Sequence, residues 1–129
     1  ASKISGPAAV LNATQSFTGV NTFTATKQTL TTDTDGATVT FDMNVSNIHT
    51  VTLAGNRTLA VSNTTAGQVF IIRLVQDATG SRTVTWFSTI KWAGGAAPTL
   101  TTTANKADTF GFTTTSAGNY DGFVIGQNI

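Results

Sequence analysis

Two closely spaced tryptophans with a lysine beside one of them, Trp86, Lys91 and Trp92, are the residues best suited to recognition chemistry. Exposed aromatic rings stack on the faces of sugars, so this group is a candidate glycan contact. A structural interpretation competes with it: Trp86 alternates with Val84 as a buried pair does, and Trp92 would cover a subunit boundary. We favour the structural interpretation, because a ring that offers ~200 Å² of surface is most often buried.

Enzyme chemistry has few residues to draw on. His49 is the only histidine and there is no cysteine, so a nucleophilic triad would depend on His49, which lies in a strand-like segment. Metal binding by His49 is not expected, because a site needs three or four ligands in the correct geometry and this is the only histidine. Carboxylate pairs can serve glycosidases, but four of the six aspartates lie in turn-like contexts, where they bond to their own backbone. We predict no catalytic residue, no metal and no cofactor.

Composition narrows the classes of partner. The 129 residues fit one domain, 10% of them are charged, and the net charge is +1, so we expect no nucleic-acid or membrane binding. No apolar run approaches the ~20 residues of a membrane span. Threonine, which favours strands, is abundant, and no helical period appears. A polar, weakly charged surface is also common where identical subunits pack side by side.

Short alternating segments step along the chain from residue 30. Val39 and Phe41 alternate with polar residues, Val51 and Leu53 do the same, and residues 69–75 are apolar on both faces except for one arginine. The latter segment is predicted to be the central strand of a two-layer core. Eight or so such strands predict an all-β fold: an antiparallel β-sandwich or jelly-roll-like head domain over residues 30–129.

Residues 1–29 form a separate segment with too little apolar surface to build a core. Phe17, Val20 and Phe23 are spaced like anchors that need the surface of another chain. We therefore predict an extended N-terminal anchoring arm over residues 1–29, with these three side chains making the anchoring or oligomer contact.

A family resemblance rests on several motifs, which run from Gly67 to Asp77, from Arg82 to Trp86, then Lys91-Trp92, Gly94-Gly95, Pro98 to Thr101 and Ala104 to Asp108. The pattern from about Asn47 to Ile129 resembles a β-rich module of bacteriophage and prophage virion surface proteins, such as tail fibres, head fibres and capsid decoration proteins. Residues 16–23 resemble shaft segments of trimeric phage fibres. The resemblance implies a non-enzymatic structural protein of the virion surface, assembled as a homotrimer.

Two places of attachment fit this resemblance. If Ala1 follows a removed initiator methionine, the protein lacks the long shaft of a tail fibre. This favours a capsid decoration or cement protein, or a short head fibre, whose arm binds the major capsid protein on the capsid exterior. The alternative is the receptor-binding tip of a tail fibre, which would recognise a host surface glycan. A polysaccharide-cleaving spike is disfavoured, because such enzymes need longer chains and acidic clefts.

Overall fold

The computed structural model describes residues 14–129, and this part of the chain is built almost entirely of strands. In chain order the elements are β1 (Leu30–Thr32), β2 (Thr38–Asp42), β3 (Ile48–Leu53), β4 (Arg57–Ser62), β5 (Val69–Gln76), β6 (Val84–Thr85), β7 (Ile90–Trp92), the 3-10 turn η1 (Ala93–Gly95), β8 (Ala107–Ser116) and β9 (Asn119–Gly126). Over the described range, no helix is long and apolar enough to span a membrane. The all-β prediction is confirmed.

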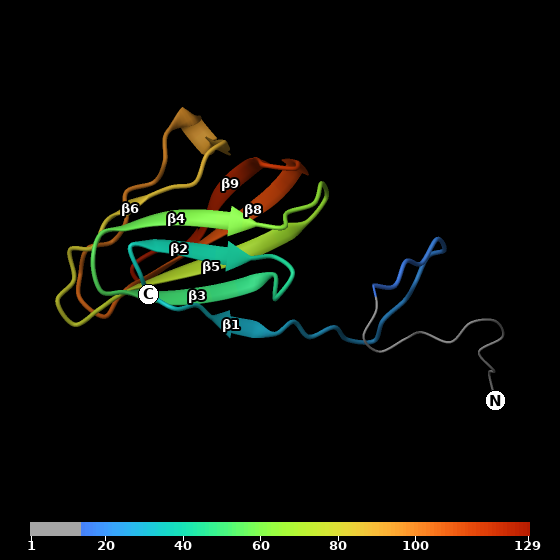
Figure 1. Ribbon diagram of the computed structural model, residues 1–129, viewed down its shortest axis with the longest axis horizontal. Helices are drawn as coiled ribbons and strands as arrows, with labels where there is room; N and C mark the ends of the chain where they lie inside the picture. Colours follow the sequence, from blue (N-terminus) through green and yellow to red (C-terminus); the bar gives the residue numbers. More distant parts are fainter. Residues whose placement is uncertain (1–13) are drawn as a thin grey trace.

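The strands form two sheets that pack face to face. The larger has six strands in the order β1-β3-β5-β8-β9-β7, and the smaller has three in the order β2-β4-β6. Figure 1 shows β2 and β4 lying in front of β3 and β5. The sandwich predicted from the sequence is therefore present.

Strand pairing differs from the antiparallel arrangement that we expected. Only β5–β8 and β8–β9 are antiparallel, whereas β1–β3, β3–β5, β2–β4, β4–β6 and β7–β9 are parallel. From β1 to β6 the chain changes sheet at every connection. Each strand therefore runs in the same direction as the previous strand of its own sheet. Alternation of apolar and polar residues indicates which face of a strand is buried, but it does not identify the neighbouring strand.

The core lies between the sheets and is rich in aromatic rings. Phe41 of the small sheet and Phe70, Phe110 and Phe112 of the large sheet are fully buried. Strand β5 lies in the interior of its sheet, between β3 and β8, as its sequence predicted. However, only the face that carries Phe70, Ile72 and Leu74 is buried; Val69, on the other face, is 52% exposed.

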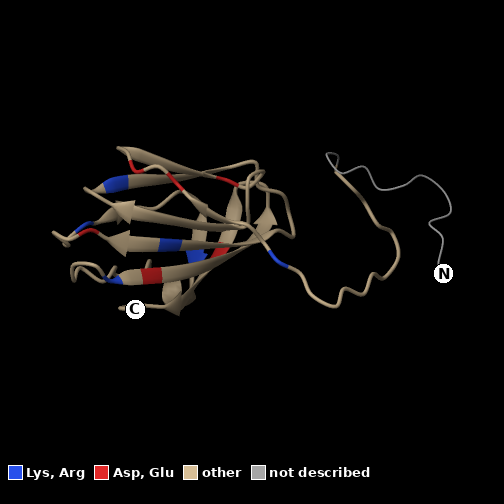
Figure 2. Ribbon diagram, turned by 90° about the horizontal axis from the view of Figure 1, so that it is seen from below, with Lys and Arg blue, Asp and Glu red and all other residues tan. Residues whose placement is uncertain are grey.

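Residues 14–29 precede β1 and contain no strand. Figure 2 shows them extending away from the sandwich at the end opposite the C-terminus. The hydroxyl of Ser46 donates a hydrogen bond to the carbonyl of Thr29, which fixes the point where this segment joins the head. The first 13 residues of the predicted arm lie outside the described residues, and the division into arm and head stays a prediction.

Candidate functional site

The head has two ends, and the strand directions determine which loops meet at each. Strands β1, β3 and β5 are parallel and begin at the arm end. The connections that follow them therefore lie at the far end, together with the β7–β8 connection and the C-terminus (Figure 1). We call this the loop end. Loops held by a rigid scaffold are where binding residues most often lie.

A pocket of about 240 Å³ opens at the loop end, between the β5–β6 and β7–β8 connections. This volume lies below the ~300 Å³ at which pockets for drug-sized ligands begin, so it suits one small ring. Its lining combines apolar side chains with threonines and one arginine: Arg82, Thr83, Val84, Trp86, Ala97, Pro98, Thr99, Leu100 and Thr102.

Trp86 joins this pocket to the core. Its ring meets that of Phe110 edge to face, with centroids 4.9 Å apart, and meets that of Trp92 in the same way at 5.1 Å. The side chain is only half-buried, because part of it lines the pocket. A half-buried ring held by other rings offers a rigid apolar surface to a ligand at little cost in conformational entropy.

The two loops around the pocket are tied together by Gln76 at the end of β5. Its side-chain NH₂ donates to the carbonyls of Arg82 and Thr101, each at 2.9 Å, and its oxygen accepts from the backbone N–H of Arg82 at 2.8 Å. The residue is 2% exposed, so these bonds replace the hydrogen bonds to water that the amide loses on burial. Gln76 therefore fixes the separation of the two pocket walls.

The β5–β6 loop is closed by an ion pair and by a close backbone approach. Arg82 donates to both carboxylate oxygens of Asp77, and these hydrogen bonds hold the pKa of Asp77 below its usual value. Gly80 has φ +72°, and a Cβ there would lie 2.6 Å from the carbonyl oxygen of Thr102. Only glycine fits this position, where one loop crosses the other.

The structure brings two of the three predicted recognition residues together. Trp86 and Trp92 are in contact and both pack against the core. Lys91 alternates with Trp92 along β7, is exposed, and lines a separate hollow of about 400 Å³ with Thr89, Thr115 and Asn119. That hollow adjoins the β8–β9 turn at the arm end, so Lys91 and Trp86 do not share a binding site.

The predicted anchoring residues extend into solvent. Phe17, Val20 and Phe23 are 62%, 102% and 65% exposed, so the head of the same chain does not bury them. Large apolar side chains in an extended segment are a typical contact surface for another chain.

His49 has a structural environment. It is fully buried; Nδ1 lies 2.8 Å from a carboxylate oxygen of Asp33 and Nε2 lies 2.9 Å from the carbonyl oxygen of Ser46. Burial raises the pKa of Asp33, and the hydrogen bond with His49 offsets part of that effect. Between residues 14 and 129, no three His, Cys, Asp or Glu side chains gather as a metal site would require.

Sequence reasoning missed the residues that shape the loop end. Gln76 ends an apolar run, and Asp108 lies between Ala107 and Thr109 at the start of β8, yet both are buried. The carboxylate of Asp108 accepts from the backbone N–H groups of Thr101 and Asn128, which holds the β7–β8 loop and the C-terminus to the sheet. A glutamine at the end of an apolar run was a signal for Gln76 alone, and the loops that contain its partners have no periodic pattern.

Comparison with known proteins gives a match to one protein family. Residues 13–114 match a protein family described as "Putative phage tail fibre C-terminal domain". The match covers most of the chain, including the pocket loops and most of β8. Searches of curated proteins and of solved structures returned no match.

Proposed function

The chain belongs to this family of phage tail fibre C-terminal domains, and on that premise we propose that it is the receptor-binding head of a tail fibre, which recognises a glycan on the host surface. The observation that carries the proposal is the separation of the arm from the aromatic pocket. The arm leaves one end of the head, while the pocket beside Trp86 opens at the other end.

A structural protein of the phage virion surface fits both places of attachment that the sequence left open. The family description supports the tail over a capsid decoration protein, a cement protein or a short head fibre on the major capsid protein. We therefore adopt the tail alternative in this proposal.

The head acts by binding and not by catalysis. Asp35 and Asp77 are held in ion pairs with arginines, Asp33 is bonded to His49, and Asp108 accepts backbone hydrogen bonds. Carboxylates with these partners stabilise loops and are not arranged around a cleft as a glycosidase pair is.

Assembly as a homotrimer is part of the proposal. Phe17, Val20 and Phe23 are exposed in one chain, and identical arms lying together would bury them. Several heads on one fibre also bring several weak glycan sites to the same surface, which raises the overall affinity without new contacts.

The pocket is tested by competition for host cells. Purified protein should reduce adsorption of the phage, and Ala97→Trp should abolish this competition, because Ala97 is exposed and a bulky ring there fills the pocket. Ala117→Trp, at the β8–β9 turn of the arm end, is the matched control and should compete like the wild type. Equal competition by both variants would contradict the assignment of the loop-end pocket.

A further inference from the structure

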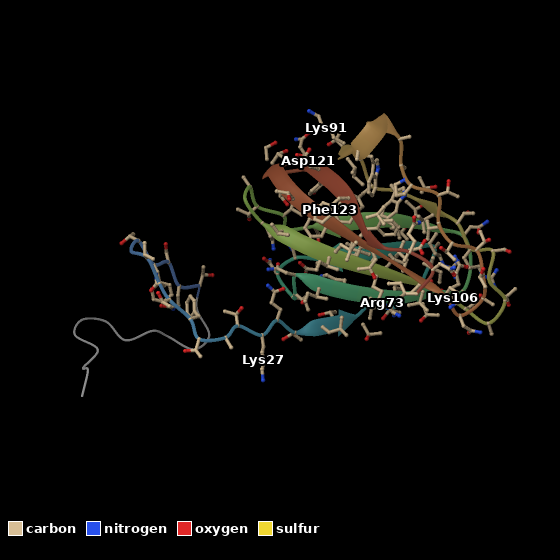
Figure 3. All side chains as sticks on the ribbon, turned by 180° about the vertical axis from the view of Figure 1, so that it is seen from behind. Lys27, Arg73, Lys91, Lys106, Asp121 and Phe123 are labelled. Carbon is tan, nitrogen blue, oxygen red and sulfur yellow. The ribbon has the colours of Figure 1, made fainter. Side chains whose placement is uncertain are left out.

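The six-stranded sheet has one face that the rest of the described chain leaves uncovered. Figure 3 looks onto this open face, which includes the labelled residues Arg73, Asp121 and Phe123. Large apolar side chains on it remain accessible: Leu30 is 60% exposed, Val69 52%, Phe123 45% and Ile125 52%. A sheet face that is left to solvent is normally polar, whereas this one carries large apolar side chains.

The strand register places Leu30 and Phe123 at the two ends of one row of residues across the open face. Leu30 pairs with Ile48, Ile48 with Ile71, Ile71 with Gly111, and Gly111 with Phe123. The row crosses five neighbouring strands and is therefore about 20 Å long. At Gly111 the ring of Phe123 fills the gap, since a Cβ there would lie 2.4 Å from that ring.

Charges of opposite sign lie on the two sides of this row. Arg73 lies two residues beyond Ile71 along β5, in register with Thr109. Asp121 lies on the opposite side of the row, in register with Thr113. Strand β8 separates the two, and neither forms an ion pair within the described part of the chain. Lys91 is the cross-strand neighbour of Asp121 at the outer edge of the same face.

We propose that the open face packs against the open faces of further copies of this chain, with Arg73 of one copy facing Asp121 of the next. An identical copy satisfies both features of the face: its apolar row covers an apolar row, and its carboxylate meets an unpaired guanidinium. In a closed ring each copy presents its Arg73 side to one neighbour and its Asp121 side to the other. The inference rests on the proposed homotrimer and gives it a surface beyond the arm.

Sedimentation velocity of the full chain tests this surface. The wild type should sediment as a trimer, and Phe123→Asp should lower the mass to that of a monomer, because it places a charge in the apolar row. Val45→Asp is the matched control: Val45 is 59% exposed but lies in the β2–β3 turn, so this variant should remain trimeric.

A charge exchange provides a second test of the same surface in case Phe123→Asp fails to fold. Arg73→Glu should weaken association at least tenfold, and Arg73→Glu with Asp121→Arg should restore most of it. A monomeric wild type, or a trimer that persists in Phe123→Asp and in Arg73→Glu, would overturn the assignment. Competition for host cells is measured on the same samples, so a trimer that persists and competes would reject this surface while leaving the proposed function intact.

Discussion

At the scale of single residues, Asp108 explains how the loop end stays in place. Burial opposes ionisation of its carboxyl group, but the hydrogen bonds from the backbone N–H groups of Thr101 and Asn128 outweigh it and hold the pKa of Asp108 below its ordinary value. A group whose pKa is lower in the folded state stabilises the fold above its unfolded pKa, about 3.9 for aspartate. That contribution is lost as the pH falls through the lower, folded pKa.

Asp108→Asn should therefore destabilise the protein at neutral pH and much less in acid. The amide is uncharged and has one acceptor oxygen, so both backbone N–H groups lose their charged partner and one of them loses its acceptor, at a cost of about 1.5–3 kcal/mol. Urea unfolding of both proteins at pH 7 and again near pH 3 checks this. A difference in unfolding free energy that is the same at both pH values would show that the carboxylate charge is not the cause.

At the scale of elements, the sequence indicated where strands lie better than how they pair. Val39 and Phe41, and Val51 and Leu53, are buried as their alternation predicted. The parallel pairs were not predictable, because they depend on which sheet the chain enters after each turn. Trp86 was found as a candidate from its type, but the pocket wall at residues 97–102 has no repeating pattern, and its position is set by hydrogen bonds to Gln76 and Asp108.

Strand β5 provides the clearest test of the core. Ile72→Ala and Leu74→Ala should each cost about 2–5 kcal/mol, because both side chains are fully buried and their removal leaves a cavity. Val69→Ala, on the open face of the same strand, should change the stability of an isolated chain by well under ~1 kcal/mol. Thermal or urea unfolding of the three variants measures the contrast. Equal losses at all three positions would mean that both faces of β5 are packed.

At the scale of the whole molecule, the arm and the head should be separable. The buried residues of the described chain all lie in the sandwich or its loops, so removal of residues 1–29 should leave a folded head. The same truncation removes Phe17, Val20 and Phe23, and we expect the shortened protein to be missing from assembled particles. Circular dichroism of the purified head and its occupancy on particles measure the two effects. Normal occupancy of the truncated protein would contradict an anchoring role for the arm.

The location of the protein on intact phage tests the central claim most directly. Immunogold labelling with antibodies raised against the head, followed by averaging of particle images, locates the chain without any assumption about its ligand. A tail fibre head that meets the host places the label on the tail fibres, at the ends that face away from the particle. Label distributed over the capsid surface would contradict the tail assignment and return the protein to the class of decoration proteins.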